Sequence, residues 1–281
     1  MSRRWQQVRH QLRRNRPAQF SLFVLFIFVV AALCAGLSPY DPDRMALGAR
    51  TLPPDAAHWF GTDEYGRDYF TRALYGGQIS LMVGFLAMLF STLIGTVVGT
   101  VSGYFGGWLD NLMMRAVDIL MAIPAFFLLL VVNAYLKPGV DNIILIISLL
   151  TWMNMSRLVR AETLSVKERE YVLYARASGE HPLSIIVRHI IPGVLPTIIV
   201  AATLNIASAI LMESTLSFLG LGVQAPAASW GSMLNNAQSY IGEASWLAMF
   251  PGILILLTVF SFNVLGDVFR TAFEPGANRD E

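Results

Sequence analysis

The chain has 281 residues, of which 55% are hydrophobic and 14% are charged, and its net charge is +1. Soluble domains carry about 25% charged residues, so this composition excludes an ordinary soluble protein and indicates a polytopic membrane protein. The single cysteine excludes an intramolecular disulfide, and the near-neutral charge gives no support for a nucleic-acid partner.

The N-terminal tail, residues 1–19, contains six arginines and no acid. Residues 20–37 follow without a charge, which is about the minimum length for a bilayer-spanning helix. A signal peptide is the alternative, but further apolar segments follow and no clean cleavage site does. The arginines could also bind nucleic acid or lipid, although the positive-inside rule is enough to explain them.

Five more apolar segments follow a polar connection at residues 38–77. They lie at 79–101, 117–136, 139–157, 194–213 and 246–267. Together with 20–37 they predict an all-α integral membrane protein with six transmembrane helices and both termini on one side. That side receives fifteen Lys and Arg residues and the opposite side receives five, which predicts cytoplasmic termini.

These spans divide the chain into five parts. They are a basic cytoplasmic tail 1–19, a first span 20–37, an extracytoplasmic loop 38–77, a core 78–267 with five helices, and a cytoplasmic tail 268–281. Within the core, Gly95, Gly99 and Gly103 share one face of the second span and predict close packing against a neighbouring helix.

Residues 161–193 form a polar island between two apolar spans. Few helix breakers occur from Glu168 to Ser178, Gly179 follows where a left-handed cap would end a helix, and Pro182 suits the start of another. The pattern predicts a helix, a tight turn and a second helix, exposed between two spans. Such a knob could transmit force to a soluble partner.

Tyr171, Tyr174 and Ala175 recur at positions i, i+3 and i+4, so they share one face of the first of these helices. Two aromatic residues beside a small one suit insertion into a groove of another protein, where tyrosine is enriched. The alternative is that this face packs back onto the spans of the same chain.

Several chemistries are missing from the sequence. It contains no Gly-x-x-x-x-Gly-Lys segment to bind a nucleotide, and it offers no pair of buried catalytic side chains, so an enzyme is not expected. Ionisable residues in the spans lie near their ends, which disfavours an ion-coupled carrier. His58, Asp63 and Asp68 could be drawn as a metal cluster, but hydrogen bonding and helix capping are the preferred interpretation.

The fifth predicted span carries a stripe of more polar or polarizable side chains. Asn205, Ser208 and Met212 lie at i, i+3 and i+7 on one helical face. They are candidates for the lining of a hydrated translocation path. Hydrogen bonding between helices is an equally good explanation.

Three stretches resemble a known family. Residues 161–193 are similar to the cytoplasmic loop of permease subunits of bacterial ABC importers, whose pattern is Glu-Ala-Ala, three residues, Gly, nine residues, Ile-x-Leu-Pro. Anchored on Gly179, the second Ala and the Pro agree (Ala175 and Pro192), whereas Leu173, Tyr174, His189 and Ile191 depart from it. The segments 61–72 and 216–234 resemble hallmarks of dipeptide, oligopeptide and nickel permeases, and 262–270 resembles the ending of the "C" type of subunit.

The resemblance implies a type I ABC importer permease fold in a bacterial cytoplasmic (inner) membrane. It also implies partners: a related second permease, two ATPase subunits that hold ATP and Mg, and an extracytoplasmic binding protein. No cofactor, metal or catalytic residue is expected on this chain. The implied substrate is a di- or oligopeptide, with nickel or a metal–chelator complex as the alternative. An ion-coupled secondary transporter is the alternative from another class.

The resemblance also assigns roles to residues. The ATPase-coupling helix would consist of Tyr171, Tyr174, Ala175, Arg176, Ala177, Ser178 and Gly179. The segment 214–245 lacks Lys and Arg and is expected to fold into the outer mouth or under a docked binding protein. Trp230, Arg67 and Asp68 are therefore candidates for the outer docking surface, with local salt bridges and helix capping as the alternative for the charged pair.

Overall fold

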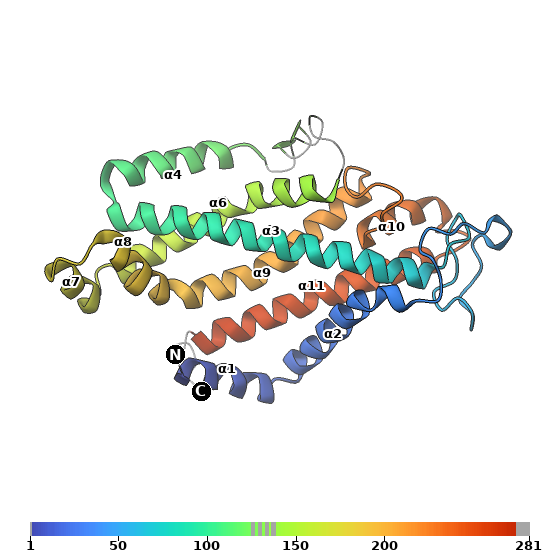
Figure 1. Cartoon of the computed structure of the whole chain (residues 1–281), viewed down its shortest axis with the longest axis horizontal. Helices are drawn as coiled ribbons and strands as arrows, with labels where there is room; N and C mark the ends of the chain where they lie inside the picture. Colours follow the sequence, from blue (N-terminus) through green and yellow to red (C-terminus); the bar gives the residue numbers. More distant parts are fainter. Residues whose placement is uncertain (1, 125–126, 129–130, 133–134, 136–138, 274–281) are drawn as a thin grey trace.

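The computed structural model describes residues 2–124, 127–128, 131–132, 135 and 139–273. Within these ranges the regular secondary structure is helical, and the only strand-like pairing is an isolated bridge between Thr62 and Asp68. The long helices form one bundle, with α7 at one end and α10 and the first polar loop at the other (Figure 1). The predicted all-α fold is confirmed.

Five segments are long and apolar enough to cross a membrane. They are α2 (Arg16–Leu33), α3 (Tyr69–Phe105), α6 (Val140–Val166), the stretch Pro182–Phe218 and α11 (Trp246–Phe273). In hydrocarbon each backbone amide must find its partner within the protein, which is why these apolar runs form unbroken helices. Each overlaps one of the six predicted spans, although α2 begins and ends four residues before the predicted 20–37 and the other helices run past the predicted ends.

The predicted third span, 117–136, is not among the five. Its beginning belongs to α4 (Gly107–Met121), and much of the remainder lies outside the described residues. A sixth span therefore stays a prediction. At the C-terminal end α11 continues to Phe273, and the rest of the predicted tail 268–281 lies outside the described residues.

The polar island is shorter than predicted. α6 continues as far as Val166, and the second half of the island runs through α8 (Pro182–Ile185) and a π-helical turn (Ile186–Ile190) directly into α9 (Ile191–Phe218). Because the long helices extend past their apolar runs, only residues 167–181 stand outside them. They contain α7 (Glu170–Ala177).

The glycine stripe of α3 packs against α6, as predicted. A Cβ atom at Gly95 would lie 2.6 Å from the Cβ of Met155, and one at Gly103 would lie 2.8 Å from the Cβ of Thr163. At Gly99 the obstacle is backbone, since the carbonyl oxygen of Ser156 would be 2.5 Å away. Small residues thus let these two helices approach to backbone distance.

The first prediction concerns this contact. Gly99→Ala is expected to destabilise the protein by about 2 kcal/mol, because the new methyl group overpacks the interface, although alanine is the better helix former by about 1 kcal/mol. The matched control is Gly252→Ala in α11, where an added Cβ meets no atom within 4 Å. Thermal unfolding of the full chain in detergent measures both. Equal midpoints for the two variants would contradict the packing argument.

Candidate functional site

α7 ends in the turn that the sequence predicts. Gly179 has φ +77°, in the left-handed region that favours glycine. The N–H of Gly179 donates to the carbonyl of Arg176 at 3.1 Å, and the N–H of Glu180 donates to the carbonyl of Ala175 at 3.2 Å. This bond pair is a Schellman motif, which satisfies the last carbonyls of the helix. Pro182 then occupies the first turn of α8.

One face of α7 is buried against the chain itself. Val172 and Ala175 belong to a core cluster that also contains Val166, Ile185 and Ile190. The alternative interpretation, in which the helix packs back onto its own spans, therefore holds for this face. It anchors α7 to the end of α6 and to the helical segment that leads into α9.

The other face is open to solvent. Tyr174 is 77% exposed and Tyr171 is 43% exposed. Both tyrosines border an open depression of about 660 Å³, and Ala175 contributes to its floor; the lining residues are Glu170, Tyr171, Tyr174, Ala175, Ser178, Glu180 and His189. The two tyrosines and Ala175 thus border the same depression, although Ala175 itself packs into the core.

Glu180 lines this depression in the turn that follows α7, where it contacts Ser184 and His189. It accepts a hydrogen bond from the Ser184 hydroxyl at 2.5 Å and lies 3.0 Å from Nε2 of His189, which belongs to the π-helical turn. The hydrogen bond from Ser184 and the neighbouring His189 lower the pKa of the Glu180 carboxyl. The turn after α7 is therefore tied to the start of the α9 span by a charged group.

The remaining predicted coupling residues lie at the end of α7. The guanidinium of Arg176 sits over the ring of Tyr104 of α3, 5.3 Å from its centroid, and the residue remains exposed. Ala177 and Ser178 are exposed beside Gly179. The solvent-facing part of the site is thus formed by the tyrosines and the capped turn.

A partly buried ion pair that the sequence did not single out supports the base of this site. Both oxygens of Asp110 accept from Arg160, each at 2.6 Å, and Ser102 also donates to this carboxylate. Lys167 donates to the carbonyl of Gly103 at 3.0 Å. The hydrogen bonds from Arg160 lower the pKa of Asp110. The ends of α3 and α6 and the start of α4 are joined in this way.

The three side chains of the polar stripe of α9 do not share one environment. Asn205 is half-buried, and Ser208 is exposed with its hydroxyl bonded to the carbonyl of Leu204 at 3.2 Å. Met212 packs against the core cluster that contains Ile143 and Ile147. Asn205 and Ser208 therefore remain candidates for a path, whereas Met212 contributes to the packing of this chain.

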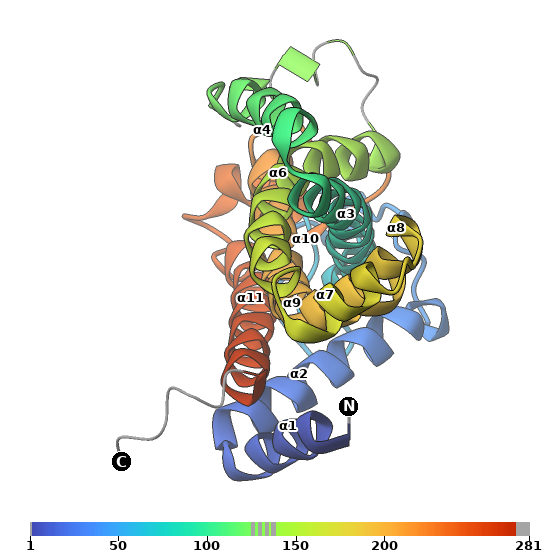
Figure 2. The same ribbon diagram turned by 90° about the vertical axis from the view of Figure 1, so that its left-hand side faces the viewer.

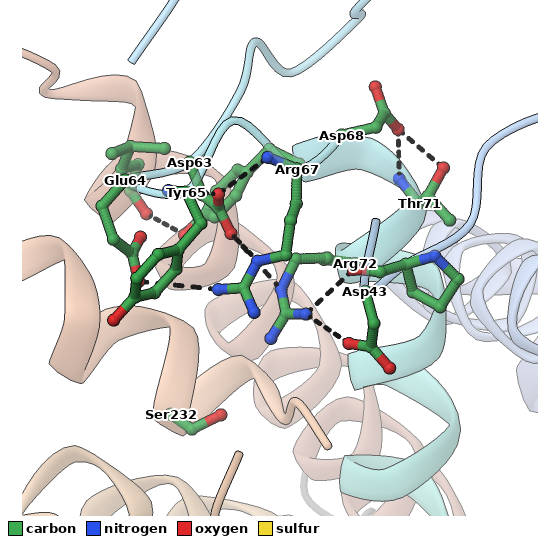
Figure 3. Close-up of polar contacts among 12 residues, drawn as sticks. Asp43, Asp63, Glu64, Tyr65, Arg67, Asp68, Thr71, Arg72 and Ser232 are labelled. Atoms are coloured by element: carbon green, nitrogen blue, oxygen red, sulfur yellow. Dashed lines mark hydrogen bonds and ion pairs between the residues drawn. The ribbon is translucent and has the colours of Figure 1, made fainter. Parts of the chain in front are cut away.

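At the opposite end of the bundle, Arg67 lies inside the protein. Its backbone N–H and its Nε donate to the carboxylate of Asp63 at 2.9 and 2.6 Å (Figure 3). Arg72 donates to the carbonyl of Pro42 and to Asp43, each at 3.0 Å. These bonds fold the loop onto the start of α3.

Asp68 is the N-cap of α3. Its Oδ2 accepts from the backbone N–H of Thr71 at 2.7 Å and from the Thr71 hydroxyl at 2.6 Å (Figure 3). Its Oδ1 lies 2.7 Å from Nδ1 of His58. The capping and salt-bridge alternative therefore fits Asp68 and Arg67 better than an exposed docking role.

Trp230 requires a correction as well, because it is 2% exposed and cannot meet a docked protein in this structure. Its Nε1 donates to the carbonyl of Ala73 at 2.9 Å, and its ring contacts Phe28 edge-on at a centroid distance of 5.9 Å. It begins α10 (Trp230–Ala237), which folds back against α3, α9 and α11. An apolar ring is more stable in this core than at a polar surface.

Glu213 is a further candidate for a functional residue. From the sequence it could be placed near the end of a span, but its burial could not be predicted. Its carboxyl group is completely buried in α9. Ser217 donates to Oε1 at 2.7 Å and Ser80 of α3 donates to Oε2 at 3.1 Å. Ser80 in turn accepts the backbone N–H of Trp230 at 3.2 Å. The signal in the sequence is an acid followed by two serines, Glu213-Ser-Thr-Leu-Ser217.

The fold and this site define a polytopic helical membrane protein, with long apolar helices, an exposed short helix at one end and a folded-back segment at the other. The chain belongs to the family of binding-protein-dependent transport system inner membrane components, which matches residues 91–279. Residues 3–54 match the N-terminal transmembrane domain of oligopeptide transport permease C.

Relatives align over nearly the whole chain. The dipeptide transport system permease protein DppC of Bacillus subtilis (strain 168) is 42% identical over 271 residues, which cover 96% of this chain and 85% of that protein. The oligopeptide transport system permease protein OppC of Escherichia coli (strain K12) is 41% identical over 274 residues, covering 96% and 91%.

A solved structure supports the fold. The inward-facing MetNI methionine ABC transporter matches with a TM-score of 0.59 and 20% identity, over 70% of this chain and 94% of that one. At this identity the likeness concerns the fold. The predicted ABC importer permease fold is confirmed by the family and by this match.

Proposed function

We propose that this chain is a transmembrane subunit of an ATP-driven importer and forms half of a path for di- or oligopeptides. The observation that carries the proposal is relatedness at about 40% identity, over nearly the whole chain, to proteins named as dipeptide and oligopeptide permeases. The sequence itself contains no nucleotide-binding glycine loop, so ATP and Mg belong on separate ATPase subunits.

The exposed tyrosines of α7 are proposed as the contact to one ATPase. Tyrosine side chains are enriched in protein interfaces, and the depression they border is open to a partner. Because Val172 and Ala175 anchor α7 in the core, movement of the ATPase would be transmitted to α6 and α9. A related second permease and an extracytoplasmic binding protein complete the proposed complex.

This assignment sets the orientation. The knob at α7 and both termini would face the cytoplasm, and α10 with the loop 38–77 would face the binding protein. The excess of Lys and Arg on the first side supports this orientation. In the proposed path, Asn205 and Ser208 would line the permease half contributed by α9.

Reconstitution of the complete complex in vesicles tests the function. Uptake of a labelled dipeptide should require ATP, the ATPase subunits and the binding protein together, while nickel uptake under the same conditions should stay at background. Dipeptide uptake that follows an ion gradient without any ATPase would overturn the proposal in favour of a secondary carrier.

A further inference from the structure

α1 (Ser2–Arg14) is a helix of its own rather than an extension of the first span. The helical run is broken at Asn15, whose side-chain oxygen accepts from the N–H of Ala18 at 3.2 Å and so caps α2. Figures 1 and 2 show α1 set at an angle to α2 and lying beside the end of α11. The basic tail is therefore held against the bundle.

The described side chains of α1 separate into two faces. Val8 is buried and Leu12 is half-buried, four residues apart on the side that packs against the protein. Arg9, Arg13 and Arg14 are exposed. At 3.6 residues per turn Arg13 and Arg14 point away from both apolar residues, and Arg9 lies at the edge between the two faces. The fold thus turns a row of guanidinium groups outward.

Among the residues that the structure describes, this positive charge has no ion-pair partner. Arg9, Arg13, Arg14 and Arg16 form no ion pair among the described residues, and residues 1–40 contain no Asp or Glu. Cations at i and i+4 repel one another along a helix, so the pair Arg9 and Arg13 costs stability unless an anion compensates it. The positive-inside rule accounts for the number of arginines. It does not explain why Arg9, Arg13 and Arg14 are exposed while Val8 and Leu12 pack inward.

The position of the basic segment relative to the apolar surface of α2 indicates which anion compensates its charge. α2 begins at Arg16, and its exposed apolar surface begins at Phe20 and continues at Phe23, which are 50% and 61% exposed. At 1.5 Å per residue, Phe20 lies only about 6 Å beyond Arg16 along the helix. Arg16 therefore sits where the exposed apolar surface of α2 ends, and α1 directly precedes it in the chain.

We propose that α1 is an interfacial helix whose arginine face binds the anionic headgroups of the surrounding bilayer. Guanidinium groups match phosphate in a bidentate manner, and a basic amphipathic helix at a membrane surface is attracted to anionic lipids. The contact would hold the cytoplasmic ends of α2 and α11 at a fixed depth. It requires neither substrate nor ATPase, so it stands apart from the proposed transport function.

Lipid proximity in the full chain tests this inference. The substitutions Cys34→Ser and His10→Cys leave one cysteine, on α1, and a fluorophore is attached to it. The labelled chain is reconstituted in vesicles of phosphatidylcholine and phosphatidylglycerol. Nitroxide on the phosphatidylglycerol headgroup should quench the fluorophore about twofold more than the same nitroxide on phosphatidylcholine. Replacing Arg9, Arg13 and Arg14 by Gln should equalise the two lipids, whereas replacing them by Lys should retain the preference.

Arg188→Gln is the matched control, since this arginine is also exposed at the α7 end of the bundle but lies outside α1. Its substitution should leave the preference unchanged. The proposal would be overturned if both lipids quench equally while the three arginines of α1 are intact. It would also be overturned if the preference survives the three Gln substitutions. A preference that vanishes when the ATPase subunits bind would instead assign the arginine face to a protein partner.

Discussion

Gly179→Pro is expected to abolish ATP-driven uptake and substrate-stimulated ATP hydrolysis while the protein stays in the membrane. Proline requires φ near −65° and has no N–H, whereas Gly179 has φ +77° and donates to the carbonyl of Arg176. The substitution therefore removes the cap of α7 at a cost of about 3 kcal/mol or more. Because α7 lies outside the long helices, the bundle itself should remain folded.

The control for this experiment is Gly179→Asn. Asparagine tolerates the left-handed conformation, and an added Cβ at this position meets no atom within 4 Å, so coupling should be largely retained. Both variants are measured in the reconstituted complex by the ratio of ATPase rates with and without substrate-loaded binding protein. A normal ratio for the proline variant would refute a coupling role for α7.

Glu213→Ala is expected to destabilise the protein by about 3 kcal/mol, since it leaves a cavity and buried serine hydroxyls without their acceptor. The hydroxyls are those of Ser80 and Ser217, and Ser80 also accepts the N–H of Trp230. The loss should loosen α10 from α3 and α9 before the whole bundle unfolds. Thermal unfolding in detergent and proteolysis between residues 219 and 229 measure the two effects.

Glu213→Gln serves as the isosteric comparison. The amide retains the volume and one acceptor oxygen, and the serine hydroxyls can reorient toward its nitrogen, so a loss below about 1.5 kcal/mol is expected. Identical unfolding midpoints for the Ala and Gln variants would show that the hydrogen bonds to Glu213 do not hold α10. Dipeptide uptake by the Gln variant then separates a structural role from one in the transport path.

The local features of this chain could be predicted because their causes act over short stretches of sequence. A charge-free run such as 20–37 is helical in a membrane whatever its neighbours, since its backbone bonds are satisfied within the run. The turn at Gly179 depends on the φ preference of one residue, and the position of Pro182 depends on its missing N–H. The glycine stripe of α3 likewise predicted a close helix contact, although not its partner α6.

Trp230 and Glu213 are the residues whose positions only the tertiary structure decided. Trp230 lies in a loop-like segment rich in small residues, and its burial depends on Ala73 and Ser80, about one hundred and fifty positions away. Glu213 lies near a span end in the sequence, but Ser80 makes it part of a buried network. Periodicity and composition describe a residue's own helix, whereas burial and hydrogen bonding depend on which distant helix packs beside it.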